Sequence, residues 1–121
     1  MQTGTYNKAV YWPNEIEQAI KFAMTKRYVV LPTQHYRLKA RTLMLPDNCY
    51  RALLHGEIVE AEVNDGCVVK VITRLRNRYN HTQDICGAIA LDGIEARVKT
   101  VWTNRCGDKH WTIRKENYVQ C

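Results

Sequence analysis

The stretch of residues 33–57, TQHYRLKARTLMLPDNCYRALLHGE, decides the fold that we expect for the chain. Apolar residues recur at three- and four-residue spacing on both sides of Leu45-Pro46, a pattern typical of two short amphipathic helices. Pro46 suits the first turn of the second helix, where its missing N–H is not needed, and Gly56 suits the position just past its end. The stretch therefore predicts two helices that fold back on one another as an αα-hairpin. Their predicted buried faces are Tyr36, Ala40, Leu43 and Met44 on the first helix, and Cys49, Ala52 and Leu53 on the second.

A histidine stands at each outer end of this segment, His35 near the start of the first helix and His55 at the end of the second. In a hairpin these two ends are neighbours, because each helix is ~15 Å long at ~1.5 Å per residue. The imidazoles would then meet, and the helix dipoles would make His35 the general base and His55 the general acid. Either histidine is also consistent with an ordinary capping or surface residue, and an open angle between the helices would separate the rings.

The rest of the chain predicts one further helix and a series of strands. Asn14 begins a helix with Glu17 as its capping-box partner, and residues 28–31 form a short extended segment. After Gly56 the pattern alternates, which predicts two hairpins, 58–63 with 67–76 and 85–91 with 94–103, and a last edge strand at 109–114. Helices followed by strands predict a single α+β domain over residues 1–121. Its helices would pack on one face of a four- to five-stranded antiparallel sheet.

Composition and charge restrict the class of protein. The 121 residues carry a net charge of +6, from 18 Lys and Arg against 12 Asp and Glu, which favours a polyanionic partner. No apolar run reaches membrane-spanning length and no signal peptide is recognisable, so we expect a cytoplasmic protein. Five cysteines without a Cys-x-x-Cys motif indicate reduced thiols. Cys106 and His110 could be half of a zinc site, but no second pair has ligand spacing, so no metal or other cofactor is expected.

Basic residues lie near the histidines in the sequence and at the end of one predicted strand. Arg37, Lys39 and Arg41 lie on the first helix of the hairpin, and Arg74 and Arg76 precede a polar loop that contains Tyr79. Arginines at these places could contact phosphates, and a tyrosine could stack on an unpaired base, although each is also consistent with a solvated surface. Two histidines among cations suit metal-independent cleavage of single-stranded RNA. One would deprotonate the 2′-OH and the other would protonate the leaving 5′ oxygen, with a 2′,3′-cyclic phosphate as product.

The segment from Gln34-His35 to His55 resembles the RegB family of phage early-messenger endoribonucleases. The similarity consists of Gln-His opening a helix, Ala40, the aliphatic Leu45, and Leu54-His55, with the histidines twenty residues apart. Lys39 stands where that family has an arginine, so the bidentate fork is lost while the charge is kept. The resemblance implies a fold like that of RelE-type ribonuclease toxins and cleavage of mRNA, on or off the ribosome. It also implies a host cytoplasm, His35 and His55 as catalytic residues, and Lys39 as the nearest phosphate contact.

Two other functions fit the same sequence. The first is a non-catalytic nucleic-acid-binding protein that uses the same basic residues, with structural histidines. The second is a small phage protein that inhibits a host protein. Salt-dependent affinity for RNA separates the first from the second, because phosphate contacts release counterions and make binding weaken steeply with salt.

Overall fold

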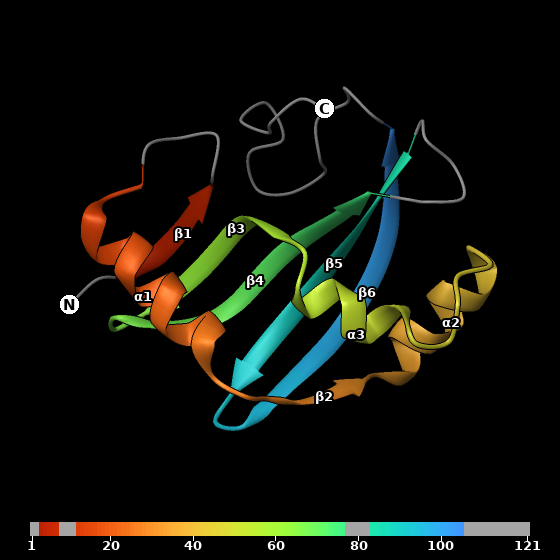
Figure 1. Ribbon diagram of the computed structural model, residues 1–121, viewed down its shortest axis with the longest axis horizontal. Helices are drawn as coiled ribbons and strands as arrows, with labels where there is room; N and C mark the ends of the chain where they lie inside the picture. The colour runs from red at the N-terminus through yellow and green to blue at the C-terminus, as the bar shows by residue number, and fades with distance from the viewer. Residues whose placement is uncertain (1–2, 8–11, 77–82, 106–121) are drawn as a thin grey trace.

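The computed structural model describes residues 3–7, 12–76 and 83–105 of the chain (Figure 1). The α+β class predicted from the sequence is confirmed. Tyr79, the expected strand at 109–114 and the Cys106–His110 pair lie outside the described residues. In chain order the elements are β1 (Gly4–Asn7), α1 (Asn14–Thr25), β2 (Val29–Pro32), α2 (Gln34–Thr42), α3 (Cys49–Leu54), β3 (Glu57–Asn64), β4 (Cys67–Arg76), β5 (Gln83–Asp92) and β6 (Glu95–Arg105).

The sheet of the described residues has six strands in the order β1-β3-β4-β5-β6-β2. The two predicted hairpins are confirmed as β3–β4 and β5–β6, both antiparallel. The prediction of a purely antiparallel sheet with four or five strands is wrong at both edges. Residues 4–7 pair with β3 as an extra strand, and β2 lies parallel to β6, with Val30 opposite Ala96.

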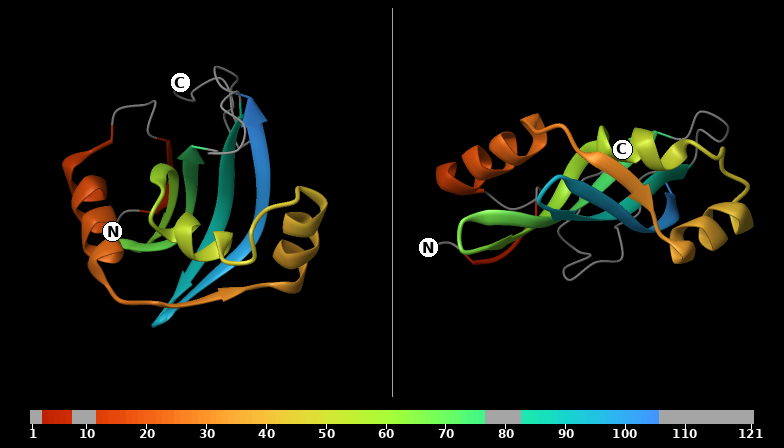
Figure 2. Two further views of the ribbon diagram at one scale, coloured as in Figure 1. Left: turned by 45° about the vertical axis from the view of Figure 1, so that its right-hand side comes forward. Right: turned by 90° about the horizontal axis from the view of Figure 1, so that it is seen from below.

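One face of the sheet carries the main core. Val71, Ile89 and Val98 lie opposite one another on β4, β5 and β6, and all three are 0% exposed. Helices α1 and α3 cover this face, whereas α2 lies beside β6 at the end of the sheet (Figure 2). Because side chains alternate along a strand, Ile72 points to the opposite face, where it packs with Val59 and Ala88 in a second, smaller cluster.

Leu53 holds helix α3 close to the sheet. Its side chain is fully buried, and its backbone carbonyl accepts a hydrogen bond of 2.5 Å from the Thr73 hydroxyl on β4. Gly87 on β5 lies opposite Thr73, and a Cβ built there would be 2.8 Å from Leu53 Cδ1. The absence of a side chain at Gly87 therefore lets α3 approach the sheet closely.

Helix α1 begins at Asn14 as predicted, but it has no capping box. Pro13 occupies the cap position, and its carbonyl accepts the N–H groups of Ile16 and Glu17 at 3.0 and 3.1 Å. No side chain caps this end. The acidic residues of the first turn, Glu15 and Glu17, still lie at the positive end of the helix dipole, where carboxylates are stabilising.

The connection between α2 and α3 departs from the expected hairpin. Met44 has a left-handed backbone (φ 58°) and is 90% exposed, so it lies outside the helix and the buried face predicted for it. Pro46 also lies before α3, and its carbonyl accepts the Cys49 N–H at 3.1 Å. Ala52, predicted to be buried, is exposed. The second helix is therefore only six residues long, and it packs on β4 and β5 instead of lying along α2.

In the described part of the chain the longest helix has 12 residues, and none has the length and apolar character needed to cross a bilayer.

Candidate functional site

Helix α2 is anchored to β6 by Thr33, the residue before its first turn. The Thr33 hydroxyl accepts the Tyr36 N–H at 3.1 Å and so caps the helix. The same hydroxyl lies within donating distance of the carbonyls of Val98 (3.2 Å) and Lys99 (3.0 Å). The Thr33 N–H also bonds to Val98, at 3.1 Å. The start of α2 is thus held at a defined point on the sheet, with Tyr36 and Ala40 turned inward.

The basic residues of α2 divide between two flanks of the helix. Successive residues are rotated by about 100°, so residues four apart share a flank. Arg37 and Arg41 form one flank, and His35 and Lys39 form the other; all four side chains are exposed. Tyr36 and Ala40, which face the core, lie between the two flanks. The helix therefore presents its basic residues on two surfaces.

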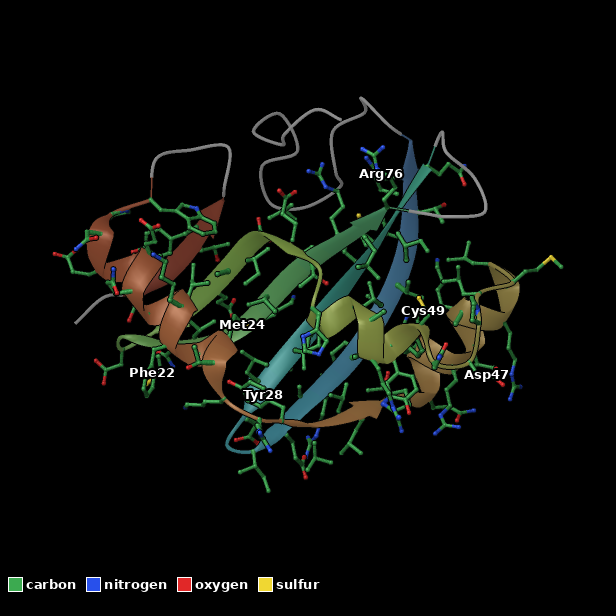
Figure 3. All side chains as sticks on the ribbon, in the orientation of Figure 1. Phe22, Met24, Tyr28, Asp47, Cys49 and Arg76 are labelled. Atoms are coloured by element: carbon green, nitrogen blue, oxygen red, sulfur yellow. The ribbon has the colours of Figure 1, made fainter. Side chains whose placement is uncertain are left out.

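The flank of Arg37 and Arg41 borders a hollow of about 320 Å³ between α2 and the start of α3. We call it the Arg–Tyr hollow. Asp47 is the acidic residue that lines the hollow. Figure 3 shows Asp47 at the end of the molecule where α2 and α3 lie. The residues of the Arg–Tyr hollow are Pro32, Tyr36, Arg37, Ala40, Arg41, Leu45, Pro46, Asp47 and Tyr50.

Two tyrosines pack together in the lining of this hollow. The rings of Tyr36 and Tyr50 meet edge to face, with centroids 6.1 Å apart and an interplanar angle of 78°. The Arg51 guanidinium lies over the Tyr50 ring, 5.7 Å from its centroid, and its Nε donates to the Tyr50 hydroxyl at 3.3 Å. Tyr50, Arg51 and Asp47 were not predicted as site residues. The sequence signal for Tyr50 and Arg51 as site residues is only their place in α3, the helix that follows the basic helix α2.

Beneath the hollow, Tyr36 and Cys49 are both buried. Burial, and then the neighbouring Cys49 thiol, raise the pKa of Tyr36 well above its ordinary value. Burial also raises the pKa of Cys49, although the neighbouring Tyr36 hydroxyl acts in the opposite direction. Both groups are therefore neutral at physiological pH, and the charge around the hollow comes from Arg37, Arg41 and Asp47.

The cations of α2 differ from Arg74 and Arg97 in having no counter-ion among the described residues. Within residues 3–7, 12–76 and 83–105, Arg37, Lys39 and Arg41 form no ion pair. Arg97 pairs with Glu95 at 2.6 Å. Arg74, predicted as an RNA contact, pairs with Glu57 and with Asp84 (4.0 Å), and its side chain is only 13% exposed. Its charge is thus balanced within the fold, which favours a structural role over a phosphate contact.

Arg76, the other predicted contact on β4, is exposed at the end of its strand. Figure 3 shows it at the top of the view, well away from Asp47 at the lower right. It therefore belongs to a different surface from the Arg–Tyr hollow.

The structure does not bring His35 and His55 together. His35 lies in the first turn of α2, on the flank turned away from the Arg–Tyr hollow, while its neighbour Tyr36 contacts Tyr50 near the start of α3. His55 comes after the end of α3, about 7–8 Å further along the helix axis from Tyr50. The hairpin expected from the sequence would have placed the start of α2 at the end of α3. Instead, the starts of the two helices meet, which separates the imidazoles.

His55 borders a second hollow of about 240 Å³, between the end of α1 and the start of β3. Figure 3 places two residues of its lining, Met24 and Tyr28, well apart from Asp47. The remaining lining residues are Lys26, Leu54, Gly56 and Ile58. Lys39, the third predicted catalytic residue, lies one turn after His35 on the same flank of α2. It is therefore near His35 but not at the hollow that His55 borders. Among the described residues there is no cluster of three His, Cys, Asp or Glu side chains that could hold a metal ion.

Comparison with known proteins finds no matching family model, no similar curated protein and no similar solved structure. The function therefore has to be inferred from the geometry and charge of the chain itself.

Proposed function

We propose that this protein binds RNA through α2, with Arg37, Lys39 and Arg41 as phosphate contacts. The observation that carries the proposal is that these three exposed cations have no counter-ion among the described residues, while Arg74 and Arg97 are paired. Unpaired cations on one helix, in a chain of net charge +6, produce a local positive potential that attracts a polyanion.

The aromatic residues beside these cations favour RNA over a featureless polyanion. Tyr50 borders the same hollow as Arg37 and Arg41, so a chain whose phosphates lie on the arginines would bring its bases close to a tyrosine. Proteins that recognise RNA commonly combine these two kinds of contact, stacking of unpaired bases and neutralisation of phosphates. The mRNA expected from the resemblance and a cytoplasmic location are consistent with this proposal.

Endoribonuclease activity is a second candidate function, and one observation favours it. His35 and Lys39 lie one turn apart on the same exposed flank, so a phosphate bound by Lys39 would lie near the His35 imidazole. His35 could then deprotonate the 2′-OH, while Lys39 stabilises the charge on the phosphate oxygens and water protonates the leaving 5′ oxygen. We therefore assign any metal-independent cleavage to His35 and Lys39, without His55.

Binding is tested by fluorescence anisotropy with a labelled 12-nucleotide single strand of RNA at several salt concentrations. The logarithm of the association constant should fall linearly with the logarithm of salt concentration. Arg37→Gln, Lys39→Gln and Arg41→Gln should each weaken binding and make this slope less steep. Lys21→Gln is the matched control, because Lys21 is an exposed helical lysine already paired with Glu17 on α1. Salt-independent affinity, or an equal loss in the control, would show that α2 is not the RNA-binding element.

Cleavage is tested by incubating the same RNA with protein in EDTA and mapping the ends of the products. Endoribonuclease activity predicts 2′,3′-cyclic phosphate ends that disappear with His35→Ala and persist with His55→Ala. Intact RNA in a sample that binds would identify the protein as a non-catalytic RNA-binding protein. Loss of cleavage in both His35→Ala and His55→Ala would instead indicate that the two histidines act together as an acid–base pair.

A further inference from the structure

The size and lining of the Arg–Tyr hollow suit a small planar group. Its volume of about 320 Å³ lies at the lower end of the range for small-molecule sites, roughly 300–1,000 Å³. Leu45, Pro46 and Pro32 supply apolar contact, and the charged groups Arg37, Arg41 and Asp47 complete the lining. An aromatic ring with a polar edge matches this combination better than a purely apolar or a purely ionic ligand.

Tyr50 provides a preorganised ring in the lining of the hollow. Its ring is held by contact with the Tyr36 ring and with the Arg51 guanidinium, so it does not have to be ordered when a ligand binds. A ring held in this way stacks on a base at little entropic cost, and stacking tolerates any base because each has a π-face.

Arg37 and Arg41 determine how a nucleotide would lie in the hollow. They are one helical turn apart on the flank that borders it, and neither forms an ion pair among the described residues. Arginines at this spacing can hold the phosphates on the two sides of a base that has turned inward.

We infer that the Arg–Tyr hollow receives one unpaired base of a bound RNA, stacked on Tyr50, with the adjoining phosphates on Arg37 and Arg41. This inference rests on the proposed RNA binding and adds the class of RNA to it. Bases in a duplex are paired and stacked within the helix, so a duplex can contact the arginines but cannot place a base on Tyr50. The protein should therefore prefer single strands and loops.

The test compares a 12-nucleotide single strand of RNA with the duplex of the same sequence, using fluorescence anisotropy at one salt concentration. The wild type should bind the single strand at least tenfold more tightly. Tyr50→Leu should weaken binding of the single strand by about five- to hundredfold, as for loss of one stacked base, with little change for the duplex. Tyr50→Phe keeps the ring and should keep the preference. Lys39→Gln, on the other flank, should weaken binding of both RNAs to the same extent.

Crosslinking of the wild type gives a second measurement that needs no substitution. Irradiation of the complex at 254 nm, followed by trypsin, should place the crosslink on Tyr50 in the peptide of residues 42–51, TLMLPDNCYR. Crosslinks confined to other peptides would overturn the inference, even if Tyr50→Leu fails to fold.

The possible outcomes distinguish failure of the base-binding inference from failure of the proposed RNA binding. Equal affinity of the wild type for single strand and duplex, with both weakened by Arg41→Gln, would refute the inserted base while leaving RNA binding in place. An absence of affinity for either RNA would remove the proposed function and the inference together.

Discussion

Gly87→Ala is expected to destabilise the protein because its new methyl group would collide with Leu53. A Cβ at this position lies 2.8 Å from Leu53 Cδ1 and 3.1 Å from Cδ2, closer than carbon atoms can pack. Leu53 cannot move freely, since it is 0% exposed and its carbonyl is bonded to the Thr73 hydroxyl. Either the leucine leaves its preferred rotamer or α3 is displaced from the sheet. Overpacking of this kind destabilises by about 1–3 kcal/mol.

Shortening the leucine should relieve part of this loss. Leu53→Ala alone leaves a cavity and should destabilise by about 2–5 kcal/mol. In the double variant the methyl group introduced at position 87 occupies space that the leucine has vacated, so its collision disappears. The double variant should therefore be more stable than the sum of the single losses predicts, by about 1 kcal/mol or more.

The free energy of unfolding is measured by urea titration, followed by circular dichroism, for the wild type, both single variants and the double variant. Gly93→Ala is the control for a glycine that faces open space. Its Cβ would meet nothing within 4 Å, although its φ of 58° still strains an alanine. A Gly87→Ala protein as stable as the wild type, or strictly additive losses in the double variant, would refute close packing of α3 on β5.

Three further predictions concern single side chains. Thr73→Val should lower the free energy of unfolding by about 0.5–1.5 kcal/mol in a urea titration, because the Leu53 carbonyl loses one bond but keeps that from the Gly56 N–H; no change would mean that the buried bond contributes nothing. Burial, then the Asp84 charge, raise the pKa of Cys86 to about 12. The folded state then retains a proton that the unfolded state loses, so the stability present below pH 9 should decline as pH rises from about 9 to 12. Urea midpoints across this window should fall less for Cys86→Ala, and an equal fall would contradict the assignment. Asp47→Asn removes the carboxylate of the Arg–Tyr hollow and should raise RNA affinity severalfold in the anisotropy assay, whereas weaker binding would indicate that Asp47 contacts the RNA directly.

The two hairpins could be predicted because their signals are local. Asp65-Gly66 joins β3 to β4 with φ values of 53° and 81°, and Gly93 follows β5 with φ 58°. Residues that tolerate such backbones stand between two alternating segments, so a few neighbouring positions are sufficient to identify each turn.

The sheet edges and the position of α3 depend on distant partners. Val29 to Pro32 could be predicted as extended, but pairing with β6 depends on residues far along the chain. The place of α3 depends on Leu53 meeting Gly87 and Thr73 on two strands that come later. No pattern within residues 33–57 contains this information, and the αα-hairpin on which the meeting of His35 with His55 depended was predicted without it.

The candidate site could be predicted in part. The exposed cations Arg37, Lys39 and Arg41 were evident from their spacing on one helix. Their division into two flanks also follows from helical periodicity, whereas the partners of Arg74 and the part played by Tyr50 follow from tertiary packing. Tyr50 in particular borders the hollow only because α3 begins beside Tyr36.

The parallel pairing of β2 with β6 also has a consequence for the order of folding. Strands β3 to β6 form a meander of neighbouring hairpins, whereas Thr33 bonds to Val98, sixty-five residues later in the chain. Closing so long a loop is slow relative to hairpin formation, so we expect the meander to form first and β2 to dock last. In pulse-labelled hydrogen exchange the amides of Val29 and Thr33 should become protected after those of Val71 and Ile89, and simultaneous protection would refute this order. A ribosome-bound chain from which β6 has not yet emerged would accordingly lack the strand to which β2 and the start of α2 are anchored.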